Sequence, residues 1–135
     1  MSNNVRTLIK LFLGLTYLYL VSASCKDIGG YNRSDFNYLS YKPSTSIGYY
    51  TGQHCDSINI DHIVSLKDAY DSGASHWSQT KKEAFANDKI NHVPSCEHIN
   101  KSKGSSGPSD FLRKSKDGKG LDYAIVNYCE YVQKY

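Results

Sequence analysis

The segment INIDHIVSL at residues 58–66 decides the fold of this chain. Apolar and polar side chains alternate along it with the period of two that is typical of a β-strand. The two faces of the predicted strand carry Ile58, Ile60, His62 and Val64 on one side and Asn59, Asp61, Ile63 and Ser65 on the other. We therefore expect a strand over residues 58–66 that presents a carboxylate and an imidazole from neighbouring positions.

The residues that follow predict a helical insertion and a second strand. Residues 67–70 favour a short helix that a Ser-Gly turn ends. Ser78 is a good N-cap for a helix over residues 78–86. Residues 90–94 then read as a second short strand, which we expect to end at its proline.

The rest of the chain predicts further helices. Residues 97–103 favour a short helix with Gly104 as its C-terminal stop. Apolar side chains at helical spacing predict an amphipathic final helix over residues 121–135. These side chains are Leu121, Ile125, Tyr128, Val132 and Tyr135. Strand, helical insertion, strand and helix together predict an α+β fold with a ββα core and added helices.

The first 24 residues have the pattern of a secretory signal peptide. Arg6 and Lys10 form a positive n-region, residues 11–21 form an apolar core, and small residues at 22–23 offer a cleavage site. The apolar run is shorter than the roughly 20 residues that a membrane-spanning helix needs. We therefore expect an exported protein without stable membrane insertion, whose residues 25–135 suffice for one domain.

Four cysteines follow the leader, namely Cys25, Cys55, Cys96 and Cys129. An even number in an exported chain predicts disulfides, and the wide spacing without a CxxC pair argues against a zinc knuckle. Three pairings exist, and the sequence does not choose among them. Cys25 directly follows the cleavage region, so a lipid anchor there is an alternative, although Ser22 stands where the lipidation motif prefers leucine.

Charge alone does not indicate a nucleic-acid-binding protein. The formal net charge of +3 falls to +1 when Arg6 and Lys10 leave with the signal peptide. From residue 100 to the end, seven Lys or Arg stand against four Asp or Glu. This modest excess favours phosphate contacts near one site over a face that follows a long duplex.

Four polar residues at separated positions point to metal-assisted hydrolysis. Asp61 and Asn100 supply the hard oxygen atoms that Mg²⁺ prefers, and His62 can take a proton near neutral pH. Taken singly, each has a plainer explanation, since an Asp-His pair suits a polar surface and Asn91 suits a turn before a strand. Their order within one ββα pattern favours a one-metal phosphodiesterase.

The other histidines have no recurrent partner pattern. We expect surface or structural roles for His54, His76 and His92. His98 lies two residues from Asn100, so it should face another side of a helix.

Several separated segments resemble the secreted HNH nucleases of the GmrSD C-terminal type. The matching segments are GYNRSDF at 30–36, DHIV at 61–64, AYDSGASHW at 69–77, AFAND at 84–88 and NKSKG at 100–104. The resemblance covers roughly residues 30–135. It implies that residues 25–135 are a single nuclease domain with the ββα-metal (HNH) fold, stabilised by disulfides.

The resemblance also implies roles for individual residues. His62 matches the general base, Asp61 and Asn100 match the metal ligands, and Asn91 matches a residue that braces the loop and orients the base. Lys103 matches a position that meets a phosphate oxygen. The implied cofactor is one divalent ion, Mg²⁺ with Mn²⁺ as the alternative. No organic cofactor is implied.

The chain departs from the family pattern in three places. NHVPS at 91–95 stands where NLLAV is usual, FLRK at 111–114 stands where WLPP is usual, and the region 41–55 is short. These departures leave the expected active residues intact and concern the rim of the substrate groove. Asn32 and Asn100 each begin an N-glycosylation sequon, and we expect Asn100 to be unmodified because the folded site holds it.

These inferences predict a secreted, metal-dependent endonuclease that hydrolyses phosphodiester bonds of nucleic acid with little sequence preference. DNA is the expected substrate and RNA the alternative, and no obligate protein partner is indicated. The other readings are a non-catalytic exported binding or cell-surface protein that retains the HNH fold, and a small structural protein without a nucleic-acid role. The sequence leaves the strand type, the cation and the oligomeric state open.

Overall fold

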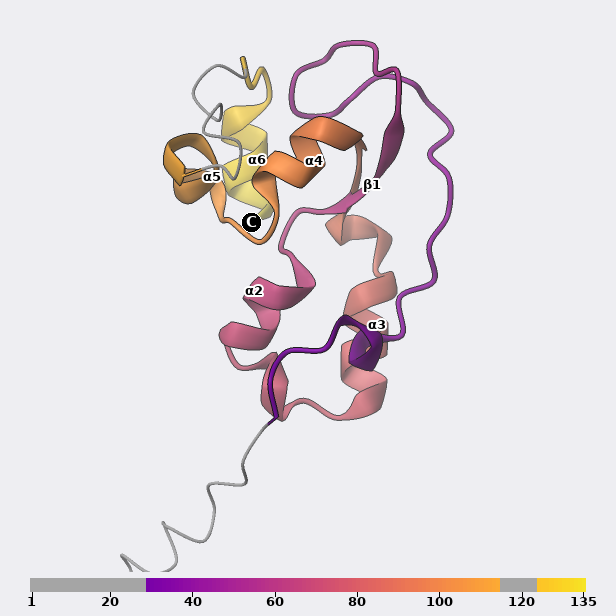
Figure 1. Cartoon of the computed structure of the whole chain (residues 1–135), viewed down its shortest axis with the longest axis vertical. Helices are drawn as coiled ribbons and strands as arrows, with labels where there is room; N and C mark the ends of the chain where they lie inside the picture. Colours follow the sequence, from indigo (N-terminus) through magenta and orange to yellow (C-terminus); the bar gives the residue numbers. More distant parts are fainter. Residues whose placement is uncertain (1–28, 115–123) are drawn as a thin grey trace, which may run out of the picture. The chain divides into compact units, whose positions relative to one another are not determined.

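A short antiparallel pair of strands forms the framework of the fold (Figure 1). The computed structural model describes residues 29–114 and 124–135. Within these residues the sheet consists of β1 (Ile58–His62) and β2 (His92–Cys96). The register places Ile58 opposite Cys96 and His62 opposite His92.

Three expectations fall outside the described residues. They are the signal peptide over 1–24, the lipid anchor at Cys25 and the first three positions of the predicted final helix.

β1 is shorter than predicted, because it ends at His62 rather than running to residue 66. The Asn91 side chain binds both backbone groups of Val64 and holds this residue out of the sheet. Ser65 then accepts a hydrogen bond from the backbone N–H of Asp68 and so caps α2 (Leu66–Asp71). The strand predicted from the alternation of side chains is therefore confirmed over residues 58–62 and wrong over residues 63–66.

β2 lies two residues later than predicted. Residues 89–91 form the 3-10 helix η3 (Lys89–Asn91), which Asp88 caps through the N–H of Ile90. Pro94 lies inside the strand and does not end it. A proline is tolerated here because each strand of a two-stranded sheet is an edge strand.

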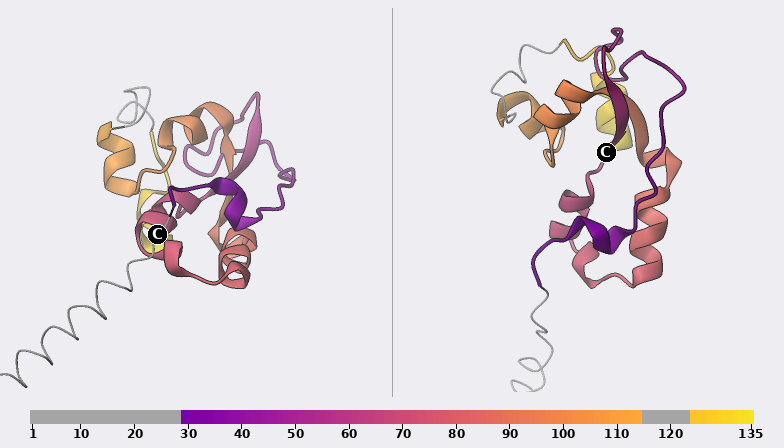
Figure 2. Two further views of the ribbon diagram at one scale, coloured as in Figure 1. Left: turned by 60° about the horizontal axis from the view of Figure 1, so that its bottom comes forward. Right: turned by 45° about the vertical axis from the view of Figure 1, so that its right-hand side comes forward.

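The helices between the strands agree closely with the prediction. α2 occupies the position expected for a short helix, and η2 (Ala74–His76) follows it. α3 (Gln79–Asn87) begins after Ser78, whose hydroxyl accepts from the N–H of Lys81 as an N-cap. Figure 2 shows the 3-10 helix η1 (Arg33–Phe36), which precedes the strands, beside α3.

The helices after the sheet agree in part with the helices predicted from the sequence. α4 (Glu97–Lys103) has the predicted bounds and ends at Gly104, and it packs on both strands. α5 (Pro108–Lys114) was not predicted, although its proline at the first helical position is a favourable start. α6 (Tyr128–Lys134) is shorter than the helix expected over 121–135, because residues 124–127 are not helical.

Two apolar clusters hold these elements together. One joins the sheet to α4, α5 and α6, and it contains Tyr50, Ile63, Val93, Ile99, Phe111 and Tyr131 together with the Cys55–Cys96 disulfide. The other joins η1, α2 and α3, and it contains Phe36, Leu66, Ala69, Ala74 and Ala86. Helices combined with a small antiparallel sheet and one disulfide confirm the α+β and disulfide parts of the prediction.

Candidate active site

A cavity of about 320 Å³ opens beside the C-terminal end of β1. Its walls come from η1, β1, the start of α2, and α4 with the loop that follows it. The lining residues are Tyr31, Arg33, Ile60, Asp61, His62, Ser65, Leu66, Lys67, Asn100, Gly104 and Ser105. The structure therefore brings three predicted site residues, Asp61, His62 and Asn100, to one cavity, whereas Asn91 and Lys103 do not line it.

The Asp61 carboxylate is almost completely buried, with 4% of the residue exposed. Its Oδ2 accepts a hydrogen bond from the Tyr50 hydroxyl at 2.6 Å and lies 3.1 Å from the Lys103 Nζ. Burial raises the pKa of the carboxyl above its ordinary value, while the Lys103 ammonium and the Tyr50 hydroxyl act in the opposite direction. Oδ1 accepts a weak hydrogen bond from Lys103 at 3.4 Å, and a carboxylate oxygen has a further lone pair for another partner.

Lys103 does not lie where the expected phosphate contact requires it. The residue has no exposed surface, and its ammonium donates to the backbone oxygen of His62 at 2.9 Å as well as to Asp61. The carboxylate supplies the charge partner that a buried ammonium needs. In this arrangement Lys103 holds Asp61 and the end of β1, and a phosphate in the cavity does not reach it.

The His62 side chain contacts a backbone oxygen of α3. Its Nε2 lies 2.8 Å from the carbonyl oxygen of Ala86, which only accepts, so a hydrogen bond to this oxygen places the proton of the neutral ring on Nε2 and leaves Nδ1 as the acceptor. Burial lowers the pKa of His62 from 6.5 to about 4; the bond to Ala86 opposes this, and His92, Arg33 and Lys103 add to it. The imidazole is therefore neutral at pH 7 and able to accept a proton.

His92 belongs to the same cluster, which the sequence did not predict. Its Nε2 lies 3.0 Å from the same Ala86 oxygen and 3.2 Å from the Nε2 of His62. Its Nδ1 lies 3.2 Å from the hydroxyl of Tyr41, which is then the donor. The pairing of the two strands is the feature that could have indicated this contact. When residue 92 lies opposite residue 62, the two imidazole rings are brought together.

Asn91 fastens the loop that follows β1. Its Oδ1 accepts from the N–H of Val64 at 2.8 Å, and its Nδ2 donates to the oxygen of Val64 at 3.0 Å. Its backbone oxygen also accepts from the N–H of Ile63 at 2.9 Å. These bonds fix the residues that directly follow His62.

Asn100 reaches the cavity from α4 and pairs with a residue of β1. Its Nδ2 donates to the Oδ1 of Asn59 at 2.7 Å, which leaves the Oδ1 of Asn100 as an acceptor. Asn59 was not predicted as a site residue, although the alternation of the strand places it on the same face as Asp61. The atom that a glycan would occupy on Asn100 is bonded, and Ser102 of the sequon is buried, so an unmodified Asn100 stays our prediction.

The donor atoms suit a hard divalent cation. The Asp61 Oδ1 and the Asn100 Oδ1 are carboxylate and amide oxygens with lone pairs to spare, and both residues line the cavity. Among residues 29–114 and 124–135 no group of three or more His, Cys, Asp or Glu gathers as a metal site. A cation here would depend on two protein oxygens and on water, as Mg²⁺ sites often do.

Comparison with known proteins assigns the chain to a family. The description GmrSD restriction endonucleases, C-terminal domain, matches residues 20–135. The chain belongs to this family. An uncharacterized secreted protein of Arthroderma benhamiae (strain ATCC MYA-4681 / CBS 112371) is 36% identical over 56 residues, which are 40% of the chain and 28% of that protein. The chain thus matches less than a third of that relative, and no solved structure matches it significantly.

The description of this family names restriction endonucleases, which are nucleases. The matched residues include every predicted site residue of this GmrSD C-terminal domain. No helix among the described residues is both long and apolar enough to cross a membrane.

Proposed function

We propose that the chain is an exported, metal-dependent endonuclease with a ββα-metal (HNH) core that hydrolyses phosphodiester bonds of nucleic acid. The observation that carries this proposal is that Asp61, His62 and Asn100 line one cavity. The order β1, β2, α4 along the chain, with α4 packed on both strands, supports the ββα core. Export is supported by the Cys55–Cys96 disulfide and by the similarity to the Arthroderma protein, which is described as secreted.

In this proposal His62 is the general base. The Ala86 carbonyl holds the imidazole so that Nδ1 takes the proton from the attacking water. Asn91 keeps the backbone after His62 in place, which fixes the direction of the ring. A positioned base of this kind typically contributes a factor of ~10² to 10⁴ to the rate.

Asp61 and Asn100 would hold the cation through one carboxylate oxygen and one amide oxygen. When bound, a divalent ion such as Mg²⁺ stabilises the charge that develops on the phosphate and on the leaving oxygen. Tyr50 and Lys103 keep the Asp61 carboxylate oriented by binding its Oδ2. Asn59 orients the Asn100 side chain in a similar way. It accepts a hydrogen bond from the amide nitrogen of Asn100, so the amide oxygen of Asn100 stays available for the cation.

The substrate contacts are proposed to be mainly with phosphates. The cavity combines charged and polar side chains, and such groups recognise the backbone of nucleic acid without reading its sequence. DNA is the proposed substrate, with RNA tested beside it.

The test is to incubate the oxidised protein with supercoiled plasmid and with RNA, each with Mg²⁺ and with EDTA. We expect nicking of the plasmid that EDTA abolishes and that Asn100→Ala reduces strongly. His98→Ala, an exposed residue of the same helix, is the matched control and should cleave at the wild-type rate. Binding of nucleic acid without any cleavage in Mg²⁺ or Mn²⁺ would instead favour the non-catalytic alternative.

A further inference from the structure

The cavity contains one basic side chain that is exposed and has no carboxylate partner. Two basic residues line it, Arg33 and Lys67. Lys67 is neutralised by Asp71, whose Oδ2 lies 2.6 Å from its Nζ. No carboxylate among the described residues pairs with Arg33, whose side chain is open to solvent. An unneutralised guanidinium beside a candidate hydrolytic site attracts an anion.

η1, which carries Arg33, is docked firmly on α3. Phe36 is fully buried in the cluster between η1, α2 and α3. Asn32 caps the helix by accepting from the N–H of Ser34 at 3.1 Å, and Gln79 of α3 donates to the backbone oxygen of Asp35 at 2.9 Å. The position of Arg33 is therefore set by a short rigid element.

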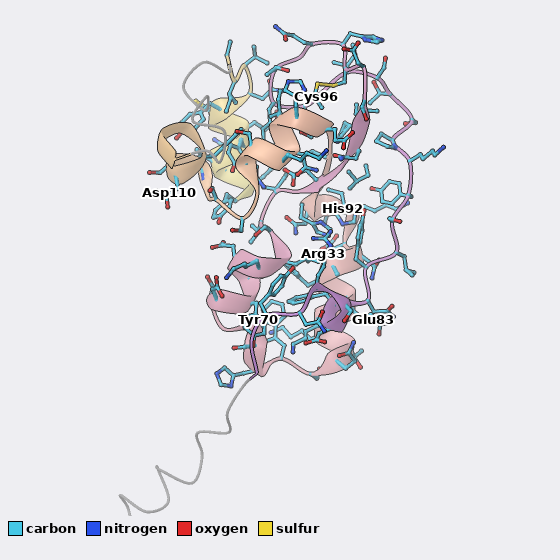
Figure 3. The ribbon with its side chains drawn as sticks, viewed as in Figure 1. Arg33, Tyr70, Glu83, His92, Cys96 and Asp110 are labelled. Atoms are coloured by element: carbon cyan, nitrogen blue, oxygen red, sulfur yellow. A yellow bond between two sulfur atoms is a disulfide. The ribbon has the colours of Figure 1, made fainter. Side chains whose placement is uncertain are left out.

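The same element brings the guanidinium close to the candidate base. The Cζ of Arg33 lies 5.6 Å from the centre of the Tyr38 ring. The Tyr38 ring in turn contacts the His62 ring edge-on at 4.6 Å and the His92 ring at 5.5 Å. Figure 3 labels Arg33 of η1 and His92 of β2. Stacking on Tyr38 restricts the guanidinium without occupying its N–H donors.

We propose that Arg33 is the residue of this site that binds the phosphate group of the substrate. Its planar fork donates two parallel hydrogen bonds to the non-bridging oxygens of the phosphodiester in the cavity. This role was expected of Lys103, which burial and the bond to Asp61 prevent. The inference rests on the proposed function, because it assigns a substrate contact to the same cavity.

The test measures binding alone, so that it does not depend on cleavage. In the His62→Ala background, the affinity for a short single-stranded DNA is measured by fluorescence anisotropy over a range of salt concentrations. We expect Arg33→Gln to weaken binding at low salt roughly tenfold or more, since hydrogen bonds to charged groups are the strong ones. The slope of log affinity against log salt should fall by about 0.7, the value of one phosphate contact on a single strand.

Two variants make the result specific. Lys67→Gln removes the other basic residue of the cavity wall and should weaken binding less than Arg33→Gln does, because the Lys67 ammonium is already engaged by the Asp71 carboxylate. Arg33→Lys should keep the slope, because it keeps the charge, but should bind less tightly than arginine, because it loses the planar fork.

An unchanged affinity and slope in Arg33→Gln would overturn the proposal, and so would an equal loss in Lys67→Gln. If wild-type protein fails to cleave plasmid while binding still depends on Arg33, the proposed catalysis is wrong and the phosphate contact stands. If wild-type protein cleaves and binding is independent of Arg33, the phosphate contact alone is wrong.

Discussion

Lys103 and Asp61 are each the charge partner of the other in the interior of the protein. The Nζ of Lys103 lies 3.1 Å from the Asp61 Oδ2, and the exposed fractions of the two side chains are 0% and 5%. Such a pair need not stabilise a fold relative to a well-packed apolar pair, but the loss of one member leaves a buried charge without a partner. The pair therefore makes the candidate site sensitive to changes at a residue that does not line the cavity.

Lys103→Ala should destabilise the protein by about 3–5 kcal/mol, because Asp61 would remain buried and unpaired. The free energy of unfolding in urea, measured at pH 7, checks this. Lys101→Ala is the matched control on the same helix, since Lys101 is 73% exposed and pairs only with Glu97 at the surface; it should change the midpoint little. Equal midpoints for both variants would contradict the buried ion pair.

His62 should make stability depend on pH between about 4 and 6.5. Its pKa is 6.5 in the unfolded chain and about 4 in the folded protein, chiefly because of burial. In this window the unfolded state binds more protons, so stability is lost as the pH falls from 6.5 toward 4, by about 3 kcal/mol in total. Urea unfolding of wild type and His62→Gln at pH 7 and pH 4.5 measures this, and the variant should lose less stability between the two. Equal losses in both proteins would contradict the shifted pKa.

At the level of single residues, the sequence predicted best what depends on local order. Alternation along β1 placed Asp61 and Asn59 on one face, and helix spacing carried Asn100 to α4. The burial of Lys103 and the contact of His92 with His62 depend on how distant elements pack, so spacing along the chain could not predict them.

Asn91, which directly precedes β2, holds the segment that follows β1 through side-chain hydrogen bonds. Its amide makes both hydrogen bonds that Val64 would otherwise make within a sheet, which explains why the strand predicted over 58–66 stops at His62. Side-chain bonds to the backbone compete with secondary structure in this way.

Asn91→Ala should lower the cleavage rate, because the backbone that follows His62 loses the side-chain hydrogen bonds that hold it in place. It should also lower stability by about 1–3 kcal/mol, since backbone groups of Val64 lose their partners. Asn87→Ala is the matched control, because Asn87 makes similar bonds to Asn37 and Leu39 in a segment that does not line the cavity. It should lose comparable stability and keep its cleavage rate under single-turnover conditions; a comparable loss of rate would contradict the specific role of Asn91.

α5 shows the limit of sequence reasoning for elements. Its seven residues begin at Pro108 after a Gly/Ser stretch that reads as a turn. The helix packs against α6, and Phe111 is fully buried in the apolar cluster that also contains Tyr50 and Tyr131. Tertiary packing rather than intrinsic propensity therefore determines this helix.

On the scale of the whole molecule, the disulfide closes the loop that contains the insertion and both strands. Cys55 and Cys96 are 41 positions apart, and the strand register places Cys96 opposite Ile58, close to Cys55. The sequence left three pairings open because the register was not known. Cys129 is exposed and without a disulfide in the described chain, and Cys25 lies outside it.

Removal of this disulfide should cost about 4 kcal/mol, as expected for a loop of this length. Urea unfolding of the Cys55→Ser, Cys96→Ser double variant measures the cost. Cys129→Ser is the control and should unfold with the wild-type midpoint under non-reducing conditions. A lower midpoint for Cys129→Ser than for the double variant would show that another pairing stabilises the protein.

In the proposed mechanism, the imidazole of His62 takes the proton from the attacking water. Its most direct test is the single-turnover rate of plasmid nicking by purified wild type and His62→Ala in saturating Mg²⁺, with folding of both checked by circular dichroism. The rate for His62→Ala should be lower than the wild-type rate by a factor of ~10² to 10⁴. Nicking by His62→Ala at the wild-type rate would contradict this mechanism.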